Sequence, residues 1–545
     1  MKEKIDKAIK KILGEEPIHL ETPDKEEFGD YSFFSKDAAL VVEKLKKDKA
    51  LLELVDKVEV LGGSFINFWL KKEVLLDNLI QIDSKKDDYG KVEIGKGKTV
   101  VIDYSSPNIA KRFSIGHLRS TIIGQALYNL YKKLGYEVIG DNHLGDWGTQ
   151  FGRLLYMIDF YKLTDFDIDK LEELYVEFHK KAEDPENTQE MEESARAWFK
   201  KLEDGDLEAR ALWQKCCDVS MDEFNKIYDL LNIKFDFQHG ESFYLDEMRK
   251  LIADSDINKQ LSIGEDGSSR VIDLSAEKIK IPLMFLKSDG ATTYATRDLA
   301  CIKFRVGEWK NLSKIIYEVG VEQTLHFQQV FAAARKLGLV GSGVDLYHTR
   351  HGLYLSGDGK KFRTREGGGV KLEGVLQEAI KRAEKLGSED RKSAEMVGIG
   401  AVKYFDLMHS VASDIIFDWD KVMNLEGDSG PYLQYTAART NSVLSKQKAV
   451  IDGKISMIKL NKEELSVARE LMHYGEVVIE AALTYSPNLL CGYLHSLAQK
   501  YNTFYNAHRI LESDNEKFRI LLTSACGQVI KNGLALLGIE APERM

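Results

Sequence analysis

The sequence lacks any apolar run long enough to cross a lipid bilayer, so we expect no membrane-spanning segment. Cysteine is scarce: five residues, scattered and without a CxxC pair, predict reduced thiols rather than a disulfide framework or a zinc site. Positive charge is not in excess, because the net charge is −11 and the pI is about 5.7. This excludes a protein that coats DNA indiscriminately, although a local basic surface can still bind phosphates. Repeats and low-complexity tracts are also missing.

What is present fits a globular protein with several cores. The chain has 545 residues, of which 43% are hydrophobic and 30% charged, and this length predicts three or more domains. Its first residues form an amphipathic, charged helix pattern without the apolar core of a signal peptide, so we expect a cytoplasmic protein. The patterning predicts a small α/β module over 1–90, a strand–helix alternation over 98–410 interrupted by a helical insertion at about 155–256, and helices alone over 411–545.

The central alternation favours an α/β fold with a doubly wound, Rossmann-like parallel sheet, because helices separate the expected strands. These strands are 99–104, 137–142, 281–286, 314–319 and 345–353. Ligands in such sheets bind beyond the carboxyl ends of the strands. In the leading module, 58–61 and 65–70 predict a hairpin across Gly62 and Gly63. An all-α bundle is expected at the end of the chain, with helices over 429–448, 463–482, 488–511 and 517–537.

The stretch KTVVIDYSSPNIAKRFSIGHLRSTIIG at 98–124 carries the first functional signal. A strand, a polar turn and a helix start follow one another, and free N–H groups at a helix N-terminus make an anion site. Gly116 would let a ligand lie against the backbone, and His117 offers a donor beside it. An ordinary strand–helix unit with a surface histidine is the alternative, and a single Gly-His pair favours that alternative.

Two further strings combine glycine with polar groups. DNHLGDWGTQFG at 141–152 follows the second expected strand, where glycines let a ligand approach the backbone; the alternative is a tight turn around a buried Trp147. GDGKKFRTREGGG at 357–369 is basic and glycine-flanked. A loop of this composition can close on a polyphosphate, although composition alone favours a solvated basic loop slightly.

Together these strings resemble the arginyl-tRNA synthetases, a class I aminoacyl-tRNA synthetase family. The matching strings run in order along the whole chain: FGDYSF at 28–33, SFINFWL at 64–70, SSPNIAKRFSIGHLRST, GDWGTQFG at 145–152, YATRDL at 294–299, GPYLQYTAAR at 430–439 and the terminal LLGIEAPERM. The resemblance implies an arginine–tRNA ligase. It activates L-arginine with ATP, releases pyrophosphate, and transfers arginine to the 3′ end of tRNA(Arg).

The resemblance also assigns the ATP side. Ser114, Ile115, Gly116 and His117 occupy the HIGH box, with Ser114 in place of its first histidine. Lys361 keeps the first lysine of the KMSKS box, whereas Thr364 replaces the second. In such family members a lysine just before the HIGH box is thought to take over, and Lys111 stands at that place. A cation near the α-phosphate neutralises charge in the transition state, whichever loop supplies it. We therefore expect Lys111, His117 and Lys361 to be catalytic, with Mg²⁺ arriving on ATP and no protein-bound metal.

For arginine, the resemblance implies two carboxylates, an aromatic ring and polar groups. A guanidinium needs bidentate carboxylate partners and tolerates an aromatic face. The residues that match are Asp103, Ser106, Pro107, Asn108, His117, Tyr294, Asp298 and Gln323. The family usually has glutamate where Asp103 stands. Alternatives remain: Asp298 can pair with Arg297 at the surface, and Tyr294 can be a core residue.

The helical C-terminal part resembles the anticodon-binding domain of this family. Unstacked bases are gripped by aromatic stacking and by hydrogen bonds to their edges. The candidate tRNA-binding residues are Tyr432, Tyr435, Tyr505 and Arg509, although burial in the bundle core is about as good an account of each tyrosine. We expect the leading module to touch the outer corner of the tRNA, and we expect a monomer.

Two other functions stay open at this stage. The first is a non-catalytic relative that binds tRNA or senses arginine, because the first histidine of the HIGH box and the second lysine of the KMSKS box are replaced. The second is another class I activating enzyme or nucleotidyltransferase with a different substrate.

Overall fold

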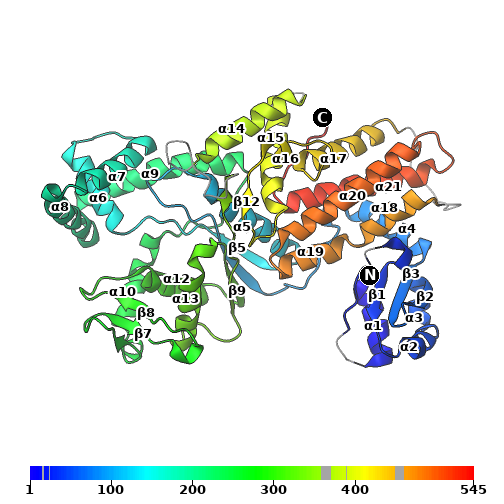
Figure 1. Cartoon of the computed structure of the whole chain (residues 1–545), viewed down its shortest axis with the longest axis horizontal. Helices are drawn as coiled ribbons and strands as arrows, with labels where there is room; N and C mark the ends of the chain where they lie inside the picture. The colour runs from blue at the N-terminus through cyan, green and yellow to red at the C-terminus, as the bar shows by residue number, and fades with distance from the viewer. Residues whose placement is uncertain (15–17, 24, 357–369, 388–389, 448–459) are drawn as a thin grey trace. The chain divides into compact units, whose positions relative to one another are not determined.

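The computed structural model describes the chain except for residues 15–17, 24, 357–369, 388–389 and 448–459, and except for the side chains of 185–187. The chain divides into two compact units (Figure 1). The first unit contains Val92–Lys381 and His409–Trp419. The second contains Met1–Lys91, Arg382–Met408 and Asp420–Met545, so it combines the leading module with the helical part of the chain.

A four-stranded parallel sheet forms the framework of the first unit. Its strands are β4 (Thr99–Asp103), β5 (Glu137–Asp141), β9 (Leu312–Tyr317) and β10 (Asp345–His348), in the order β10-β9-β4-β5. The β4 sequence TVVID is buried along its whole length, as expected for a central strand covered on both faces. The doubly wound parallel sheet predicted from the sequence is thereby confirmed.

The winding direction reverses between β4 and β9. Helix α5 (Ile115–Lys133) leads from β4 to β5 on one side, and α13 (Thr324–Lys336) leads from β9 to β10 on the other. Helix α12 (Tyr294–Glu308) packs beside α13, and both share one apolar cluster with Val101 and Ile315 of the sheet. In sheets of this kind the crevice at the reversal point is where ligands bind.

Two expected strands depart from the prediction. β8 (Leu283–Leu286) does not join the parallel sheet; it pairs antiparallel with β7 (Arg270–Ile272), which in turn pairs with β6 (Ser262–Ile263). The residues of β8 alternate between buried (Leu283 and Phe285) and exposed (Met284). This alternation is typical of an antiparallel sheet with one solvated face and does not suit a central strand of a parallel sheet. The last expected strand ends at His348, and the short β11 (Tyr354–Leu355) pairs with β12 (Ile415–Ile416). Strands therefore continue slightly past residue 411, where we expected them to stop.

Helices fill the region between β5 and β6. They are α6 (Thr149–Phe160), α7 (Ile168–Ala182), α8 (Pro185–Asp204), α9 (Leu207–Leu230), α10 (Leu245–Ala253) and α11 (Ser255–Asn258), with a 3-10 turn η3 (Glu241–Tyr244) before α10. A Cβ added at Gly152 of α6 would lie 2.2 Å from the carbonyl oxygen of Ala195, so α6 and α8 are in very close contact. The side chain of Asp206 caps α9 by accepting from the amide of Ala209.

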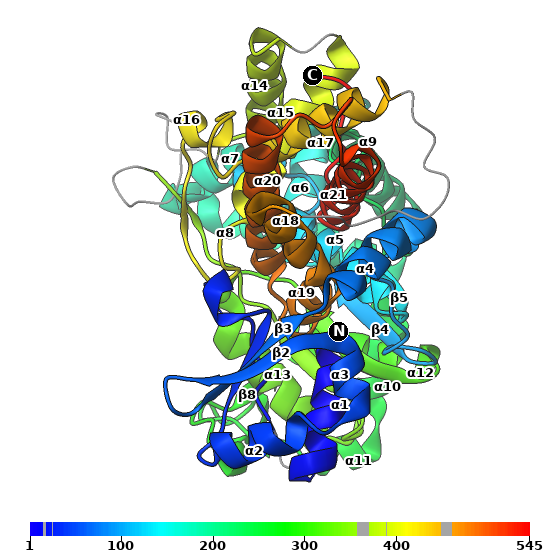
Figure 2. The same cartoon turned by 90° about the vertical axis from the view of Figure 1, so that its right-hand side faces the viewer.

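The second unit begins with an antiparallel sheet. Its order is β1-β3-β2, with β1 (Tyr31–Phe34), β2 (Val55–Leu61) and β3 (Phe65–Leu70), and the predicted hairpin between β2 and β3 is confirmed. The helices around it are α1 (Lys2–Leu13), α2 (Ala38–Leu45), α3 (Lys49–Leu54) and α4 (Lys72–Lys85). Figure 2 gives a side view of this sheet.

The rest of the second unit is helical, as predicted. Its helices are α15 (Arg391–Leu407), α17 (Gly430–Leu444), α18 (Lys462–Met472), α19 (Tyr474–Leu483), α20 (Pro487–Ala507) and α21 (Glu516–Leu536). Along the sequence, the division between the units falls within α14 (Leu372–Lys385) and within α16 (Trp419–Val422). The single helix expected over 463–482 is two helices that meet at His473. The leading module and these helices are joined inside the unit, because the hydroxyl of Tyr31 donates to Glu476 over 2.8 Å and Arg469 pairs with Asp30 at 3.1 Å.

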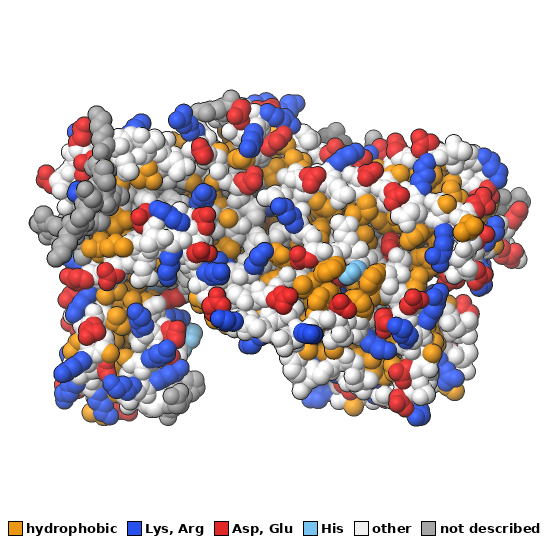
Figure 3. Space-filling model, turned by 180° about the vertical axis from the view of Figure 1, so that it is seen from behind, with side chains coloured by type: hydrophobic (Ala, Val, Ile, Leu, Met, Phe, Trp, Pro, Cys, Tyr) orange, Lys and Arg blue, Asp and Glu red, His pale blue; other side chains and the backbone are white. Residues whose placement is uncertain are grey.

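The surface carries both signs of charge. In Figure 3, lysine and arginine side chains alternate with aspartate and glutamate over the displayed face. Among the residues that the structure describes, no helix is both long and apolar enough to cross a membrane.

Candidate functional site

The segment 104–113, which we call the substrate loop, leaves β4 in an unusual backbone conformation. Ser105, Ser106 and Ala110 have φ angles of 74°, 48° and 62°, a left-handed region that residues other than glycine rarely adopt. Each such residue costs roughly 1 to 3 kcal/mol and persists only where surrounding contacts impose it. Here the hydroxyl of Ser120 donates to the Ser105 carbonyl over 3.0 Å, and Asn142 accepts from the Ser106 amide over 3.1 Å. Strain is therefore concentrated directly after the central strand.

The loop is paired with the glycine-rich segment that follows β5. The Gly145 amide donates to the Pro107 carbonyl over 3.0 Å, and the Ile109 amide donates to the Gly145 carbonyl over 3.2 Å. A Cβ on Gly145 would lie 2.1 Å from Oδ1 of Asn108, so any larger residue here would displace the Asn108 side chain. The two strings that the sequence singled out separately thus form one structure, and Asn108 is exposed beside it.

Helix α5 begins after Ser114, and its first amide, that of Ile115, donates to the Val370 carbonyl over 2.9 Å. Gly116 is exposed, and Ser114 precedes the helix in an extended conformation. The Ser114 amide donates to Nδ1 of His117 over 3.0 Å, which assigns the ring proton to Nε2. Burial of the ring, followed by the positive charge of Lys111, lowers the pKa of His117 to about 4. His117 is therefore a neutral donor at physiological pH.

A cavity of about 520 Å³ lies at the reversal point of the sheet, between the start of α5 and the ends of β9 and β10. Of the predicted site residues, it is lined by Ser106, Ser114, Gly116, His117 and Gln323. Among the described residues, the other predicted ones are not part of its lining: Asp103, Pro107, Asn108, Lys111, Tyr294 and Asp298. Lys361 lies outside the described residues.

Glu318 and His351 are among the cavity residues that the sequence analysis missed. Glu318 follows β9 and is fully buried, and Nδ1 of His351 lies 2.8 Å from its Oε1. The hydroxyl of Thr349 donates to the other oxygen of the same carboxylate. The signal that could have found both residues is their position, since each directly follows a strand whose carboxyl end faces the cavity.

Asp103 forms a buried ion pair with Arg305. Its Oδ2 lies 2.8 Å from Nη2 of Arg305, a fully buried residue of α12, and its Oδ1 accepts from the hydroxyl of Ser106 over 2.9 Å. The same guanidinium nitrogen contacts Asp141 at 2.9 Å. Burial raises the pKa of Asp141, but His239 and Arg305 more than offset this and hold the pKa well below its usual value. Asp103 thus meets an arginine of the chain itself.

The start of α12 carries Tyr294 and Asp298 one turn apart. Tyr294 is 64% exposed, and the guanidinium carbon of Arg297 lies 5.0 Å from the centre of its ring. Asp298 does not pair with Arg297; its Oδ2 lies 2.5 Å from Nε2 of His326. Burial lowers the pKa of His326, but the Asp298 carboxylate outweighs burial and raises it overall. Arg297 instead contacts Glu241 at 2.9 Å.

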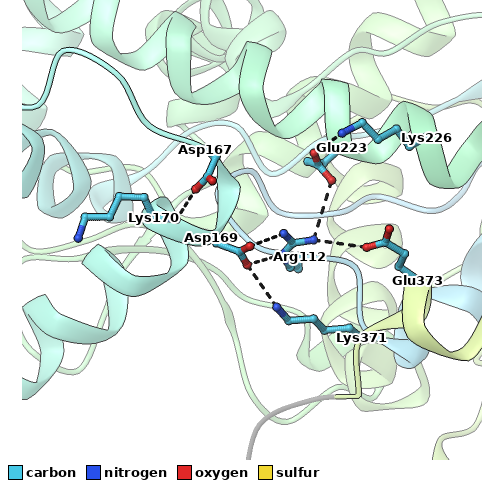
Figure 4. A network of polar contacts seen from close by, with 8 residues as sticks. All are labelled: Arg112, Asp167, Asp169, Lys170, Glu223, Lys226, Lys371 and Glu373. Atoms are coloured by element: carbon cyan, nitrogen blue, oxygen red, sulfur yellow. Dashed lines mark hydrogen bonds and ion pairs between the residues drawn. The ribbon is translucent and has the colours of Figure 1, made fainter.

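An ion-pair network surrounds the approach to α5 (Figure 4). Arg112 donates from Nε and Nη2 to the two carboxylate oxygens of Asp169, each over 2.5 Å, and Lys371 lies 3.2 Å from the same carboxylate. Two backbone hydrogen bonds join residues 113–115 to 370–372 beside it. The Nζ of the adjacent Lys111 lies 5.0 Å from the centre of the Tyr175 ring on α7.

The predicted tRNA-binding residues lie in the second unit. The guanidinium of Arg439 is 4.8 Å from the ring centres of both Tyr435 and Tyr505, and both rings are partly exposed. The hydroxyl of Tyr432 accepts from Asn502 over 2.9 Å, and Arg509 pairs with Glu512. Arg439 was not predicted, but its place in the string YTAAR beside Tyr435 was a signal. Among the described residues, no group of three or more His, Cys, Asp or Glu side chains could hold a metal ion.

Comparison with known proteins extends over the whole chain. The family model "tRNA synthetases class I (R), catalytic domain" matches residues 78–419, and the model "DALR anticodon binding domain" matches 433–545. A curated arginine–tRNA ligase of Clostridium botulinum (strain Alaska E43 / Type E3) is 38% identical, covering 99% of this chain and 96% of its own. That of Lactococcus lactis subsp. cremoris (strain SK11) is 40% identical, covering 99% and 98%.

Solved structures give the same picture at the level of the fold. The arginyl-tRNA synthetase of Thermus thermophilus superposes with a TM-score of 0.83 at 24% identity and covers 100% of both chains. That of Plasmodium falciparum gives a TM-score of 0.81 at 25% identity, covering 100% of this chain and 98% of its own.

Proposed function

The chain belongs to the class I arginyl-tRNA synthetases, which are ligases that use ATP, and we propose that it joins L-arginine to tRNA(Arg) in two steps at the cavity beside α5. First, a carboxylate oxygen of arginine attacks the α-phosphorus of ATP, giving arginyl-adenylate and pyrophosphate. Then a terminal ribose hydroxyl of the tRNA attacks the carbonyl carbon of the adenylate and AMP leaves. No protein nucleophile takes part, so catalysis consists of positioning and electrostatics.

The observation that carries this proposal is the cavity at the reversal point of the sheet, which the start of α5 lines. A helix N-terminus attracts phosphate, and the exposed Gly116 keeps the backbone accessible there. His117 adds a neutral Nε2–H donor, because its Nδ1 is already occupied by the Ser114 amide. His351, fixed by Glu318, lines the same cavity.

On the ATP side we assign Ser114, Gly116, His117, Lys111 and Lys361. The ammonium of Lys111 rests over Tyr175, and its long flexible side chain would carry it to the α-phosphate when ATP is bound. Lys361 takes the corresponding role of the KMSKS box. Mg²⁺ arrives with ATP, since this ion prefers phosphate oxygens and keeps several of its waters.

On the arginine side we assign Ser106, Pro107, Asn108, His117, Gln323, Tyr294 and Asp298. Asp298 offers the guanidinium a carboxylate, exchanging its present contact with His326 for the substrate. Tyr294 offers an exposed aromatic face. Asp103 keeps a supporting role, because its carboxylate is already shared between Arg305 and the hydroxyl of Ser106.

For the tRNA we assign Tyr432, Tyr435, Tyr505 and Arg509, and we add Arg439. The partly exposed rings on either side of the Arg439 guanidinium suit stacking of unpaired bases. We also propose the domain boundaries given above, with a tRNA-binding leading module at 1–90 and an anticodon-binding domain at 411–545. A cytoplasmic monomer completes the proposal.

Charging of total tRNA tests this function directly. Purified protein, ATP and labelled arginine should produce arginyl-tRNA, and each other amino acid in a parallel reaction should not. Retained tRNA binding without charging would instead establish a non-catalytic relative. Charging with a different amino acid would overturn the substrate assignment.

A further inference from the structure

One face of helix α9 follows the substrate loop from end to end. Ser220, Phe224 and Tyr228 recur every four residues and are all buried, so they project from the same side of the helix. Ser220 accepts from the Ala110 amide over 2.9 Å, and the ring centres of Phe224 and Phe113 are 4.9 Å apart. Both parts of the loop that have left-handed backbone receive a contact from this helix.

The hydroxyl of Tyr228 contacts the part of the loop in which two consecutive residues, Ser105 and Ser106, have left-handed backbone. It lies 2.9 Å from Oγ of Ser105 and accepts from Nδ2 of Asn142 over 3.0 Å. The other end of the same amide, Oδ1 of Asn142, accepts from the backbone of Ser106. One phenol therefore links the two consecutive left-handed serines to the end of β5.

The rest of the Tyr228 side chain packs apolar surface. Its ring centre lies 4.9 Å from that of Phe235 and 5.5 Å from that of Phe113. The ring of Tyr228 thus makes the packing contacts and its hydroxyl makes the hydrogen bonds. Phenylalanine at this position would keep the packing contacts and lose the hydrogen bonds. Tyr228 is absent from the described lining of the cavity, whereas Ser105 and Ser106 belong to it.

We propose that α9 acts as a template for the substrate loop, which means that its contacts hold the loop in its left-handed backbone conformation. Tyr228 is then a positioning residue for arginine activation. A loop whose preferred backbone differs from its bound one needs external contacts to stay in place. The Tyr228 hydroxyl supplies such a contact to the residues immediately before Asn108. The helical insertion then contributes to activation without touching either substrate. This inference rests on the proposed arginine activation.

Tyr228→Phe tests the proposal in the full-length protein. The assay is arginine-dependent exchange between ATP and pyrophosphate, with saturating tRNA(Arg), well below the melting temperature. We expect the KM for arginine to rise about tenfold, while the KM for ATP stays within twofold. Tyr156→Phe, on α6 of the same insertion, is the matched control, because its ring packs against Phe160 and Phe178, and it should behave as wild type. A lower melting temperature with unchanged arginine kinetics would overturn the proposal.

A second variant and a second measurement cover other outcomes. Ser220→Ala removes the acceptor of the Ala110 amide and should raise the KM for arginine about threefold. Amide hydrogen exchange over residues 105–110 should be faster in Tyr228→Phe than in wild type, and this holds whether or not the protein is active. Wild-type protein without any exchange activity would count against the proposed function alone. Equal hydrogen exchange in the two proteins would count against the template.

Discussion

Ser114 stands where the HIGH box has a histidine, and its backbone amide fixes which ring nitrogen of His117 carries the proton. Its amide occupies Nδ1 of His117, and burial makes that ring hard to protonate. A neutral imidazole donates a hydrogen bond without adding charge. A cation is therefore still needed near the phosphate, and the described lysine nearest to the box in sequence is Lys111.

Replacing Lys111 with alanine should therefore damage activation most. We expect the exchange rate of Lys111→Ala to fall by about a hundredfold, the size of effect seen when one preorganised donor to the transition state is lost. Lys170→Ala removes a partly exposed lysine of α7 that pairs with Glu173 and should leave the rate unchanged. A wild-type rate in Lys111→Ala would end the idea that this lysine compensates for the altered boxes.

The low pKa of His117 makes stability depend on pH. The folded value is about 4 and the ordinary value 6.5, so the unfolded chain binds more protons between these pH values. The stability that the neutral ring contributes is complete above pH 6.5 and is lost as the pH falls toward 4. Discounted for partial exposure, it amounts to roughly 1 to 2 kcal/mol.

Lowering the pH from 7 to 5 should thus reduce the melting temperature of the wild type more than that of His117→Gln. The exposed His19 gives a control, since His19→Gln should follow the wild type. Parallel melting curves of wild type and His117→Gln at both pH values would contradict this expectation.

Asp298 gives the test of the arginine pocket. In Asp298→Asn the side chain keeps its shape and loses its charge, and a charged hydrogen bond contributes roughly 1.5 to 3 kcal/mol. We expect the KM for arginine to rise ten- to a hundredfold with the KM for ATP little changed. Glu308→Gln, at the exposed end of the same helix, is the control. Unchanged use of arginine by Asp298→Asn would show that the pocket lies elsewhere.

Asp103 marks the limit of prediction at this scale. Its place at the end of a buried strand is visible in the sequence, because TVVID reads as a strand by itself. Its partner is not visible, because Arg305 lies on a helix some two hundred residues further along and only the folded sheet brings the two together. Glu318 and His351 were missed because both fall inside the strands expected over 314–319 and 345–353, whereas the observed strands end at Tyr317 and His348.

At the scale of elements, local patterns were sufficient for most strands and helices and insufficient for their partners. β8 has the length and composition of a strand, yet its alternating burial suits the small antiparallel sheet rather than the parallel one. The contacts between α9 and the substrate loop also join residues far apart in sequence. Periodicity predicts a helix at α9, but it does not say what the buried face covers.

Gly145 offers a test at this scale, since it holds two loops together. The added methyl group of Gly145→Ala would meet Oδ1 of Asn108 at 2.1 Å, so Asn108 must move. We expect kcat/KM for arginine to fall at least tenfold. Gly307→Ala, in α12 where no atom lies within 4 Å of the new methyl, should have no effect. Equal activity of the two variants would mean that Asn108 does not contact the substrate.

At the scale of the whole molecule, the candidate active site lies in one unit and the candidate anticodon residues lie in the other. We propose that tRNA bound to the second unit is needed before the first unit activates arginine at its full rate. We therefore expect arginine-dependent ATP–pyrophosphate exchange to rise at least tenfold when tRNA(Arg) is added. A tRNA with an oxidised 3′ ribose, which cannot accept arginine, separates binding from product formation. Equal exchange rates with and without tRNA would rule out this coupling.

The second unit has a consequence for how the protein is made. Tyr31 and its partner Glu476 are 445 residues apart in sequence, so the ribosome finishes the leading module long before the surface that receives it. At about 5 to 20 residues per second, this delay lasts about 20 to 90 seconds. During that time Asp30 and Tyr31, both buried in the finished protein, lack their partners Arg469 and Glu476. This unit cannot complete its fold until Glu476 and the helices around it have been made, whereas the substrate loop and α9 are complete once Leu230 has been added.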